Sequence, residues 1–215
     1  ISVEFAMMKI CALVIALASV QAFVPVSNTA RSSLLLNAKS QAIPFLDAPP
    51  ALDGSMAGDV GFDPLGLSGI TGIGADLYWM REAELKHARV AMLAVTGAIF
   101  VEGCGSLPGW PEGYGKSQTD VFWDVWAEKP NAIVAAICFF TVVELISGVA
   151  TTAGRESGLR EPGDFMFNPL QFKVTDELRM KEILNGRLAM IAAAGIILQG
   201  MTTHNGALHN LFLGE

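Results

Sequence analysis

Two stretches of this 215-residue chain repeat one pattern, and the repeat constrains the fold more than any other feature. Residues 84–93 read ELKHARVAML and residues 182–191 read EILNGRLAMI, so Glu, Arg, Ala and Met recur at the same places. Each copy combines a carboxylate, a possible metal ligand and a guanidinium, and then continues into a long apolar segment. Charges in such a segment are costly unless they are paired. The repeat therefore predicts two related helices that use these charged groups in the same way.

The charges of each copy are spaced so that they do not meet within their own helix. Glu84 and Arg89, like Glu182 and Arg187, are five residues apart, which places them about 140° apart around a helix. If the two copies pack face to face about a local two-fold axis, Glu84 meets Arg187 and Glu182 meets Arg89. Small residues follow on the same faces and permit a close crossing: Ala88, Ala91, Gly186, Ala189 and Ala193. We therefore predict that the first and third long helices cross as a pseudo-two-fold pair.

The composition indicates a membrane protein. Hydrophobic residues make up 52% of the chain, which is high for a soluble protein of this size. Three apolar segments, at about 76–102, 131–148 and 175–200, are long enough to cross a bilayer. The formal charge of −7 argues against nucleic-acid binding, and the three cysteines lack the spacing of a zinc site or a disulfide framework. The predicted fold class is an all-α membrane protein with three transmembrane helices.

Helix boundaries follow from capping residues. Asp76 is a candidate N-cap for the first helix, and Thr175 and Asp176 are candidates for the third. The first helix is about 40 Å long, against a hydrocarbon core of about 30 Å, so we expect its N-terminal end, with Arg81 and Glu82, to project at the surface.

A second repeat precedes the two related helices. Residues 58–65 read GDVGFDPL and residues 163–170 read GDFMFNPL, which predicts the same turn before each helix, with a buried Phe and Leu. The intervening segment 103–131 is rich in Gly and Pro and then in aromatic residues, as expected of a segment that lies at the membrane interface.

The patterns ExxHxR at residues 84–89 and ExxNxR at residues 182–187 resemble the light-harvesting chlorophyll-binding protein family, over roughly residues 45 to 200. The resemblance implies that the two Glu–Arg pairs tie crossed helices together and that Glu84, His87, Glu182 and Asn185 ligate chlorophyll magnesium. The physical chemistry agrees. A chlorophyll is a neutral complex that needs an axial ligand, and a Glu shared with Arg, or a neutral His or Asn, leaves no net charge in lipid.

Three further positions follow from the resemblance or remain open. Glu144 in the middle helix is either a chlorophyll ligand, as a Glu of the family's middle helix is, or a protonated or paired structural residue; we favour the ligand. Gln199 lies close to the helical face of Asn185, as the family's additional ligand on this helix does. His204 and His209 are either ligands or solvated tail residues, and we favour the second reading.

The resemblance also implies a function. Such a protein is not an enzyme: it holds chlorophylls and carotenoids at fixed distances and passes excitation energy to a photosystem. Residues 44–47, 58–68 and 81–87 are most similar to a red-lineage antenna group often attached to photosystem I. The implied cofactors are chlorophyll a, chlorophyll c and carotenoids of the fucoxanthin or diadinoxanthin type. The implied partners are a photosystem core, with photosystem I favoured, other antenna subunits and membrane lipid.

The N-terminal region resembles a targeting sequence. Residues 1–38 read as a leader with a short secretory signal and a Ser-rich, acid-free transit segment, before an antenna domain at 39–215. The Ala-Phe-Val-Pro junction at 22–25 resembles presequences of secondary plastids. Positive charges gather in loop 149–175, which predicts a thylakoid protein with a stromal N-terminus and a lumenal C-terminus.

Other functions fit the sequence less well. Glu84-x-x-His87 is half of a di-iron carboxylate pattern of a membrane oxidase, but Asn185 replaces the His that the second copy needs. The candidate ligands do not include the set of His or Cys residues that a zinc site needs. A transporter or channel leaves the Glu–Arg repeat unexplained.

Within the resembled family, a stress-induced quencher needs lumenal acids that sense pH. The candidates are Glu112, Asp120, Asp124, Glu128 and Glu215. They are scattered and partly balanced by lysines, so we predict no sensor.

Overall fold

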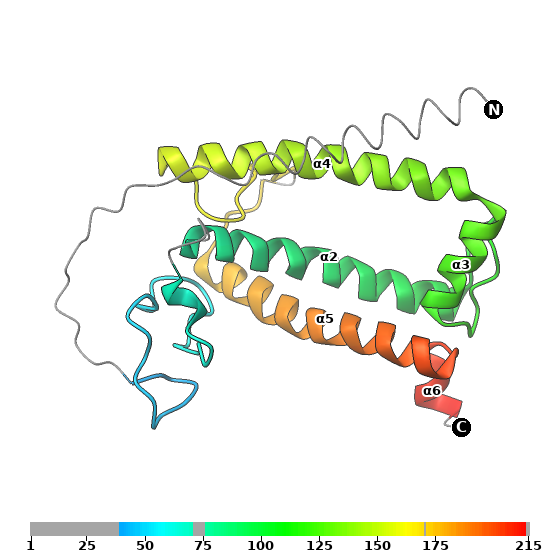
Figure 1. The fold of residues 1–215 in the computed structure, drawn as a ribbon, viewed down its shortest axis with the longest axis horizontal. Coiled ribbons are helices and arrows are strands. Elements are labelled where there is room, and N and C mark those ends of the chain that lie inside the picture. Colours follow the sequence, from blue (N-terminus) through cyan, green and yellow to red (C-terminus); the bar gives the residue numbers. More distant parts are fainter. Residues whose placement is uncertain (1–38, 71–75, 170, 214–215) are drawn as a thin grey trace. The chain divides into compact units, whose positions relative to one another are not determined.

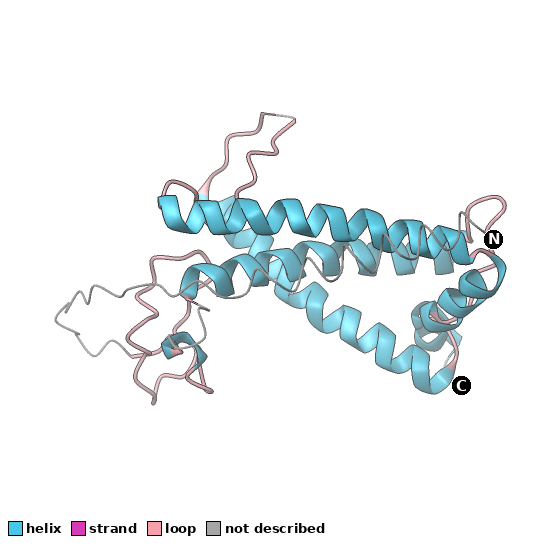
Figure 2. Cartoon of the chain, turned by 45° about the horizontal axis from the view of Figure 1, so that its top comes forward, coloured by secondary structure: helices cyan, strands magenta, loops and turns pink. Residues whose placement is uncertain are grey.

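The computed structural model describes residues 39–70, 76–169 and 171–213, and the predicted targeting sequence at 1–38 lies outside this part of the chain. Within it all regular structure is helical, and the extended pairings are two isolated bridges (Figures 1 and 2). The elements are η2 (Leu67–Gly69), α2 (Leu77–Cys104), α3 (Gln118–Glu128), α4 (Pro130–Ser157), α5 (Asp176–Thr203) and α6 (Ala207–Leu213).

Three of these helices are long and apolar enough to cross a membrane. α2, α4 and α5 each have 28 residues, which at about 1.5 Å per residue gives roughly 42 Å. The predicted three-span, all-α fold is confirmed. By its internal contacts the chain divides into two compact units, residues 1–85 with 144–183 and residues 86–143 with 184–215, which we describe separately.

The predicted N-cap of the first helix is present. The amide of Trp79 donates to Asp76 Oδ1 at 3.1 Å, and the Asp76 carboxylate also pairs with Arg155 of α4 at 2.8 Å. At the third helix, α5 begins at Asp176, and the carbonyl of Thr175 accepts the amide of Leu178 at 3.0 Å. Both starts therefore fall where the sequence predicts them.

The middle helix is longer than predicted, because α4 continues beyond residue 148 to Ser157. Glycine weakens a helix, but tertiary contacts support this extension. Thr151 is buried, and Gly154 packs so closely against Tyr78 that a Cβ there would lie 2.9 Å from the Tyr78 hydroxyl. The helix ends before Gly158, which adopts the left-handed conformation with φ 63° that favours glycine at this position.

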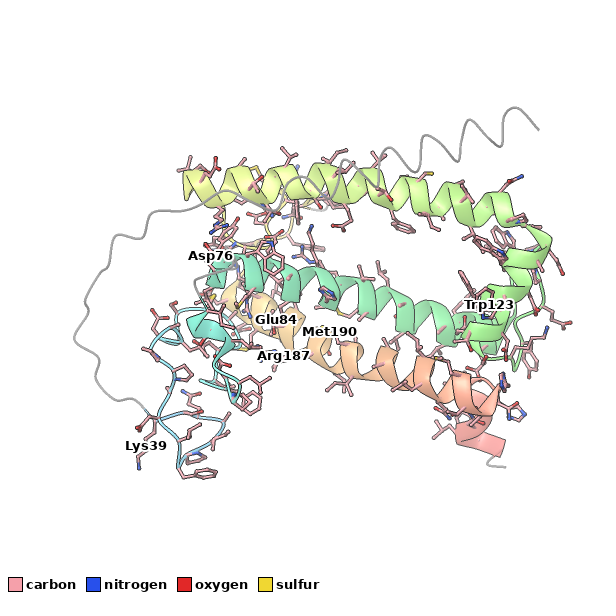
Figure 3. All side chains as sticks on the ribbon, viewed as in Figure 1. Lys39, Asp76, Glu84, Trp123, Arg187 and Met190 are labelled. Carbon is pink, nitrogen blue, oxygen red and sulfur yellow. The ribbon has the colours of Figure 1, made fainter. Side chains whose placement is uncertain are left out.

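The predicted interfacial segment contains the helix α3, although its Gly and Pro content predicts a loop. Ser117 caps α3 by accepting the Asp120 amide at 3.1 Å, an Ser-x-x-Asp pattern that is a known start signal. Phe122, Trp123 and Trp126 of α3 are exposed, as expected of residues at a membrane interface (Figure 3 labels Trp123).

The repeated turn is confirmed in its backbone. Gly61 and Met166 occupy equivalent positions with φ 66° and 55°, and Gly66 and Gln171 do so with φ 65° and 52°. The polar contact is repeated as well. Asp63 accepts the amide four residues later at 3.0 Å, and Asn168 accepts its counterpart at 3.1 Å.

The prediction that these turns bury their apolar side chains is wrong. Phe62, Leu65 and Phe167 are 57%, 78% and 87% exposed, and Leu170 lies outside the described residues. The turns close through backbone and carboxylate or amide hydrogen bonds, which leaves the apolar side chains on the outside.

Candidate functional site

The N-terminal end of α2 contains a buried charge, Glu82, which the sequence predicts to project at the surface. Glu82 is only 2% exposed. Its carboxylate accepts from Arg160 Nη2 at 2.8 Å, from the Gly163 amide at 2.5 Å and from the Thr151 hydroxyl at 3.3 Å. A buried carboxylate requires such partners. The prediction of a projecting Glu82 is therefore wrong, because loop and α4 residues distant in sequence cover it.

Arg160 extends this contact into a network of unit one. Its guanidinium also donates to the carbonyls of Ala150 at 3.0 Å and Asp164 at 2.5 Å, and it lies over the Phe165 ring at 4.2 Å. A planar guanidinium suits this combination of several acceptors and an aromatic face. The network joins α2, α4 and the loop before α5.

Glu84, the first predicted ligand, has a partner in its own helix. Arg81 Nη1 donates to Glu84 Oε2 at 2.7 Å, and Arg81 Nη2 donates to the Ala57 carbonyl. The five-residue spacing from Glu84 to Arg89 predicts no pair within the helix. Arg81, however, is only three residues from Glu84 and lies on the same helical face. Arg81 was also expected to project, yet its side chain is only 10% exposed, whereas that of Glu84 is 26% exposed.

The predicted ligands lie on all three long helices and on both units. Unit one contains Glu84, Glu144 and Glu182, whereas His87, Asn185 and Gln199 belong to unit two with Arg89 and Arg187. His87, Glu144 and Asn185 are exposed, and the other three ligand candidates are half-buried. None of the six is buried, whereas their neighbours Leu85, Ala88 and Ile183 are.

Arg155 is the basic residue nearest to Glu144 in the sequence and is therefore a candidate partner for its carboxylate. Arg155, which lies on the same helix, pairs with Asp76 at 2.8 Å. The hydroxyl of Ser147 donates to the Glu144 carbonyl at 3.0 Å and lies 3.4 Å from Glu144 Oε2. The nearest basic residue in the sequence is thus engaged with the start of α2.

Unit two brings α2 and α5 together through small residues. A Cβ at Gly186 would overlap the Cβ of Ala88, so the two helices touch at this point. Ala88 and Ala91 are buried as well. The predicted close approach through small residues is confirmed for Ala88 and Gly186.

The far end of α2 contains a second buried carboxylate. Glu102 is 5% exposed and accepts the His209 amide at 2.7 Å, next to Gly206, where a Cβ would collide with the carboxylate. No residue type in the sequence predicts this contact, because its donor is a backbone group. It holds the start of α6 against α2.

The two tail histidines have different surroundings. His204 is 71% exposed, and its Nδ1 lies 3.2 Å from Asp120 Oδ1. The hydrogen bonds from Ser117 and then from His204 lower the pKa of Asp120, while the hydrogen bond to Asp124 raises the pKa of Lys116. His209 contributes its backbone amide to the Glu102 contact.

Metal-ligating side chains are dispersed over the described residues. No group of three or more His, Cys, Asp or Glu residues in this part of the chain could hold a metal ion. A di-iron carboxylate site needs such a cluster.

The fold and the repeated motif together define a class: an all-helical protein with three helices long and apolar enough to cross a membrane, two of which contain the same motif of charged and polar side chains. The family described as Chlorophyll A-B binding protein matches residues 48–201, and the chain belongs to it.

Two relatives illustrate the match. The chain is 35% identical over 201 residues to the Photosystem I chlorophyll a/b-binding protein 5 of Arabidopsis thaliana, covering 79% of this chain and 73% of that protein. It is 36% identical over 188 residues to the Chlorophyll a-b binding protein 7 of Solanum lycopersicum, covering 76% and 66%. Family membership confirms that chlorophyll is the cofactor class and that the chain is not an enzyme.

Proposed function

We propose that this chain is a light-harvesting antenna subunit that binds chlorophylls and carotenoids and passes excitation energy to a photosystem. The observation that carries the proposal is the duplicated motif on α2 and α5, in which the candidate ligands Glu84, His87, Glu182 and Asn185 are not buried, whereas Leu85 and Ile183 beside them are. The bound chlorophylls supply the light absorption and the energy transfer. The protein supplies ligands, spacing and exclusion of water.

The residues fit chlorophyll in a way that is repeated in both halves. We assign one magnesium each to Glu84, His87, Glu144, Glu182, Asn185 and Gln199. His87 is followed on α2 by the exposed Val90 and Leu93, at 64% and 76%. Asn185 is followed on α5 by Leu188 and Ile191, at 68% and 73%. An axial ligand beside an exposed apolar surface suits a flat, largely apolar macrocycle.

The charges of the motif complete the assignment. We propose that Glu84 pairs with Arg187 and Glu182 with Arg89, so that each ligand carboxylate is neutralised by the other helix. The contact between Ala88 and Gly186 supports this proposal, since it brings α2 and α5 close together next to these residues.

The finer assignment rests on the similarity of residues 44–47, 58–68 and 81–87 to the red-lineage antenna group. We propose chlorophyll a with chlorophyll c, carotenoids of the fucoxanthin or diadinoxanthin type, and photosystem I as the preferred partner. The location is the thylakoid of a secondary plastid, with a stromal N-terminus and a lumenal C-terminus. The relative that is named for photosystem I supports the choice of partner.

The test is the absorption spectrum of the protein purified from its native membrane, together with its co-purification. We expect chlorophyll a Qy bands with chlorophyll c and fucoxanthin-type bands, in a fraction that contains photosystem I. Chlorophyll b in place of c would overturn the red-lineage assignment, and association with photosystem II alone would overturn the choice of partner. A protein without chlorophyll would overturn the function.

A further inference from the structure

We propose that Arg81 is a positioning residue for the magnesium ligand Glu84, an inference that rests on the proposed function. Arg81 Nη1 lies 2.7 Å from Glu84 Oε2, and the side chains are 10% and 26% exposed. A carboxylate has two oxygens with about four acceptor positions, so the bond from Arg81 and the proposed pair with Arg187 still leave a position for magnesium coordination. Residues that orient a metal ligand from behind fix its direction and its basicity.

Arg81 can orient Glu84 because it is itself held from the other side. Its second terminal nitrogen, Nη2, donates to the carbonyl of Ala57. That carbonyl belongs to a loop closed by Asp59, whose carboxylate accepts the amides of Gly54 and Gly61, both at 2.9 Å. The guanidinium therefore bridges an ordered loop and the ligand. A lysine ammonium lacks the planar fork that makes both bonds from fixed directions.

The second copy of the motif provides an internal comparison. Arg179 precedes Glu182 by three residues, as Arg81 precedes Glu84. Arg179 Nη2 is instead 2.5 Å from Glu161, and its Nη1 is 3.9 Å from Asp176. The same residue at the same spacing thus makes different contacts in the two halves. The inference applies to the α2 site, and Arg179→Met is its matched control.

The experiment is a double-mutant cycle on the full chain, refolded with chlorophyll a, chlorophyll c and a carotenoid extract. The variants are Arg81→Met, Glu84→Gln, the double variant and the control Arg179→Met. The measurements are chlorophylls per polypeptide, pigment affinity and the excitonic circular dichroism bands in the visible region. We expect Arg81→Met to weaken one chlorophyll site by about 10- to 100-fold. Its spectral change should match that of Glu84→Gln, and Arg179→Met should leave this site intact.

The cycle separates positioning from general stability. If Arg81 acts through Glu84, the double variant loses no more pigment than Glu84→Gln alone. Additive losses, or an Arg81→Met protein with wild-type pigment content and bands, would overturn the inference. If Arg81→Met does not fold, Arg81→Lys with and without Glu84→Gln replaces it, and a wild-type spectrum for Arg81→Lys contradicts the role of the fork. A wild-type chain that binds no chlorophyll refutes the proposed function itself, which is a different outcome.

Discussion

Glu82 and Arg160 form an ion pair 2.8 Å long whose side chains are only 3% and 14% exposed. Neither residue belongs to the duplicated motif, yet Glu82 lies two positions from the ligand candidate Glu84. Removal of one partner of a buried pair leaves the other charge without compensation, which is far more damaging than loss of a surface pair. The pair is therefore a more vulnerable contact than the more exposed pair between Arg155 and Asp76 in the same unit.

The first prediction concerns this pair. Glu82→Ala leaves Arg160 without its carboxylate partner and the Gly163 amide without its acceptor, and should lower the unfolding free energy of the pigmented protein by about 3–5 kcal/mol. Arg155→Met removes a more exposed pair with Asp76 and should change it by about 1 kcal/mol or less. Thermal loss of the visible circular dichroism measures both. Equal losses for the two variants contradict the ranking.

The second prediction tests the proposed pairing between the two helices. Arg89→Leu leaves Glu182 without its partner and should impair pigment assembly strongly, since an unpaired charge in the membrane costs several kcal/mol. Combining Arg89→Glu with Glu182→Arg should restore part of the folding while the Glu182 ligand is lost. Refolding yield with pigments is the measurement. If the single and the exchanged variants refold equally well, the pairing is wrong.

The third prediction uses the repeated turn. Met166 and Gln171 adopt φ 55° and 52°, where their counterparts are glycines. A left-handed conformation costs a non-glycine residue roughly 1–2 kcal/mol. A glycine lowers stability by about 0.4–1 kcal/mol, because it gives the unfolded chain more conformational entropy. Met166→Gly and Gln171→Gly should each stabilise the protein, by about 0.5–1 kcal/mol.

Gly66→Ala is the control for this prediction. The added Cβ has no neighbouring atom within 4 Å, so the substitution introduces only the backbone strain of φ 65°. It should therefore destabilise the turn by a similar amount. Chemical denaturation followed by circular dichroism measures all three variants. A stabilising Gly66→Ala shows that the backbone conformation is not the cause.

The fourth prediction concerns pH. Hydrogen bonds from Ser117 and His204 hold the pKa of Asp120 below its ordinary value of 3.8. A carboxyl with a lowered pKa contributes stability that is complete above the unfolded value and is lost as the pH falls through the folded value. Asp120 therefore stays ionised at pH 5. The chlorophyll fluorescence lifetime should change little between neutral pH and about pH 5.

The same measurement distinguishes an antenna from a stress-induced quencher. Asp120→Asn should leave the lifetime unchanged over this range, as should exchange of Glu112, Asp124 and Glu128 for their amides. A strong, reversible shortening in acid that disappears in these variants identifies a quencher.

The fold was predictable because its main signals are local. Apolar length predicts α2, α4 and α5, and Asp76 is a cap that a sequence alone reveals. α3 is not predicted, because the Gly and Pro residues around it indicate a loop. Ser117 and Asp120 nevertheless form a recognisable start signal for a helix. The continuation of α4 depends on Gly154 packing against Tyr78, a tertiary contact that overrides the helix propensity of glycine.

The candidate site was predictable only in part. Repetition identifies Glu84, His87, Glu182 and Asn185, and the small residues indicate the contact between Ala88 and Gly186. The burial of Glu82 was not predictable, since its donors come from residues 151, 160 and 163, far along the chain.

The two buried carboxylates of α2 also impose an order in time. Glu82 accepts the amide of Gly163, and Glu102 accepts the amide of His209. During synthesis, α2 emerges long before either donor exists. Both ends of the helix must remain hydrated at the membrane surfaces until the later segments arrive. A nascent chain can therefore complete the Glu82 end after residue 163 is made, but it can complete the Glu102 end only after residue 209 is made.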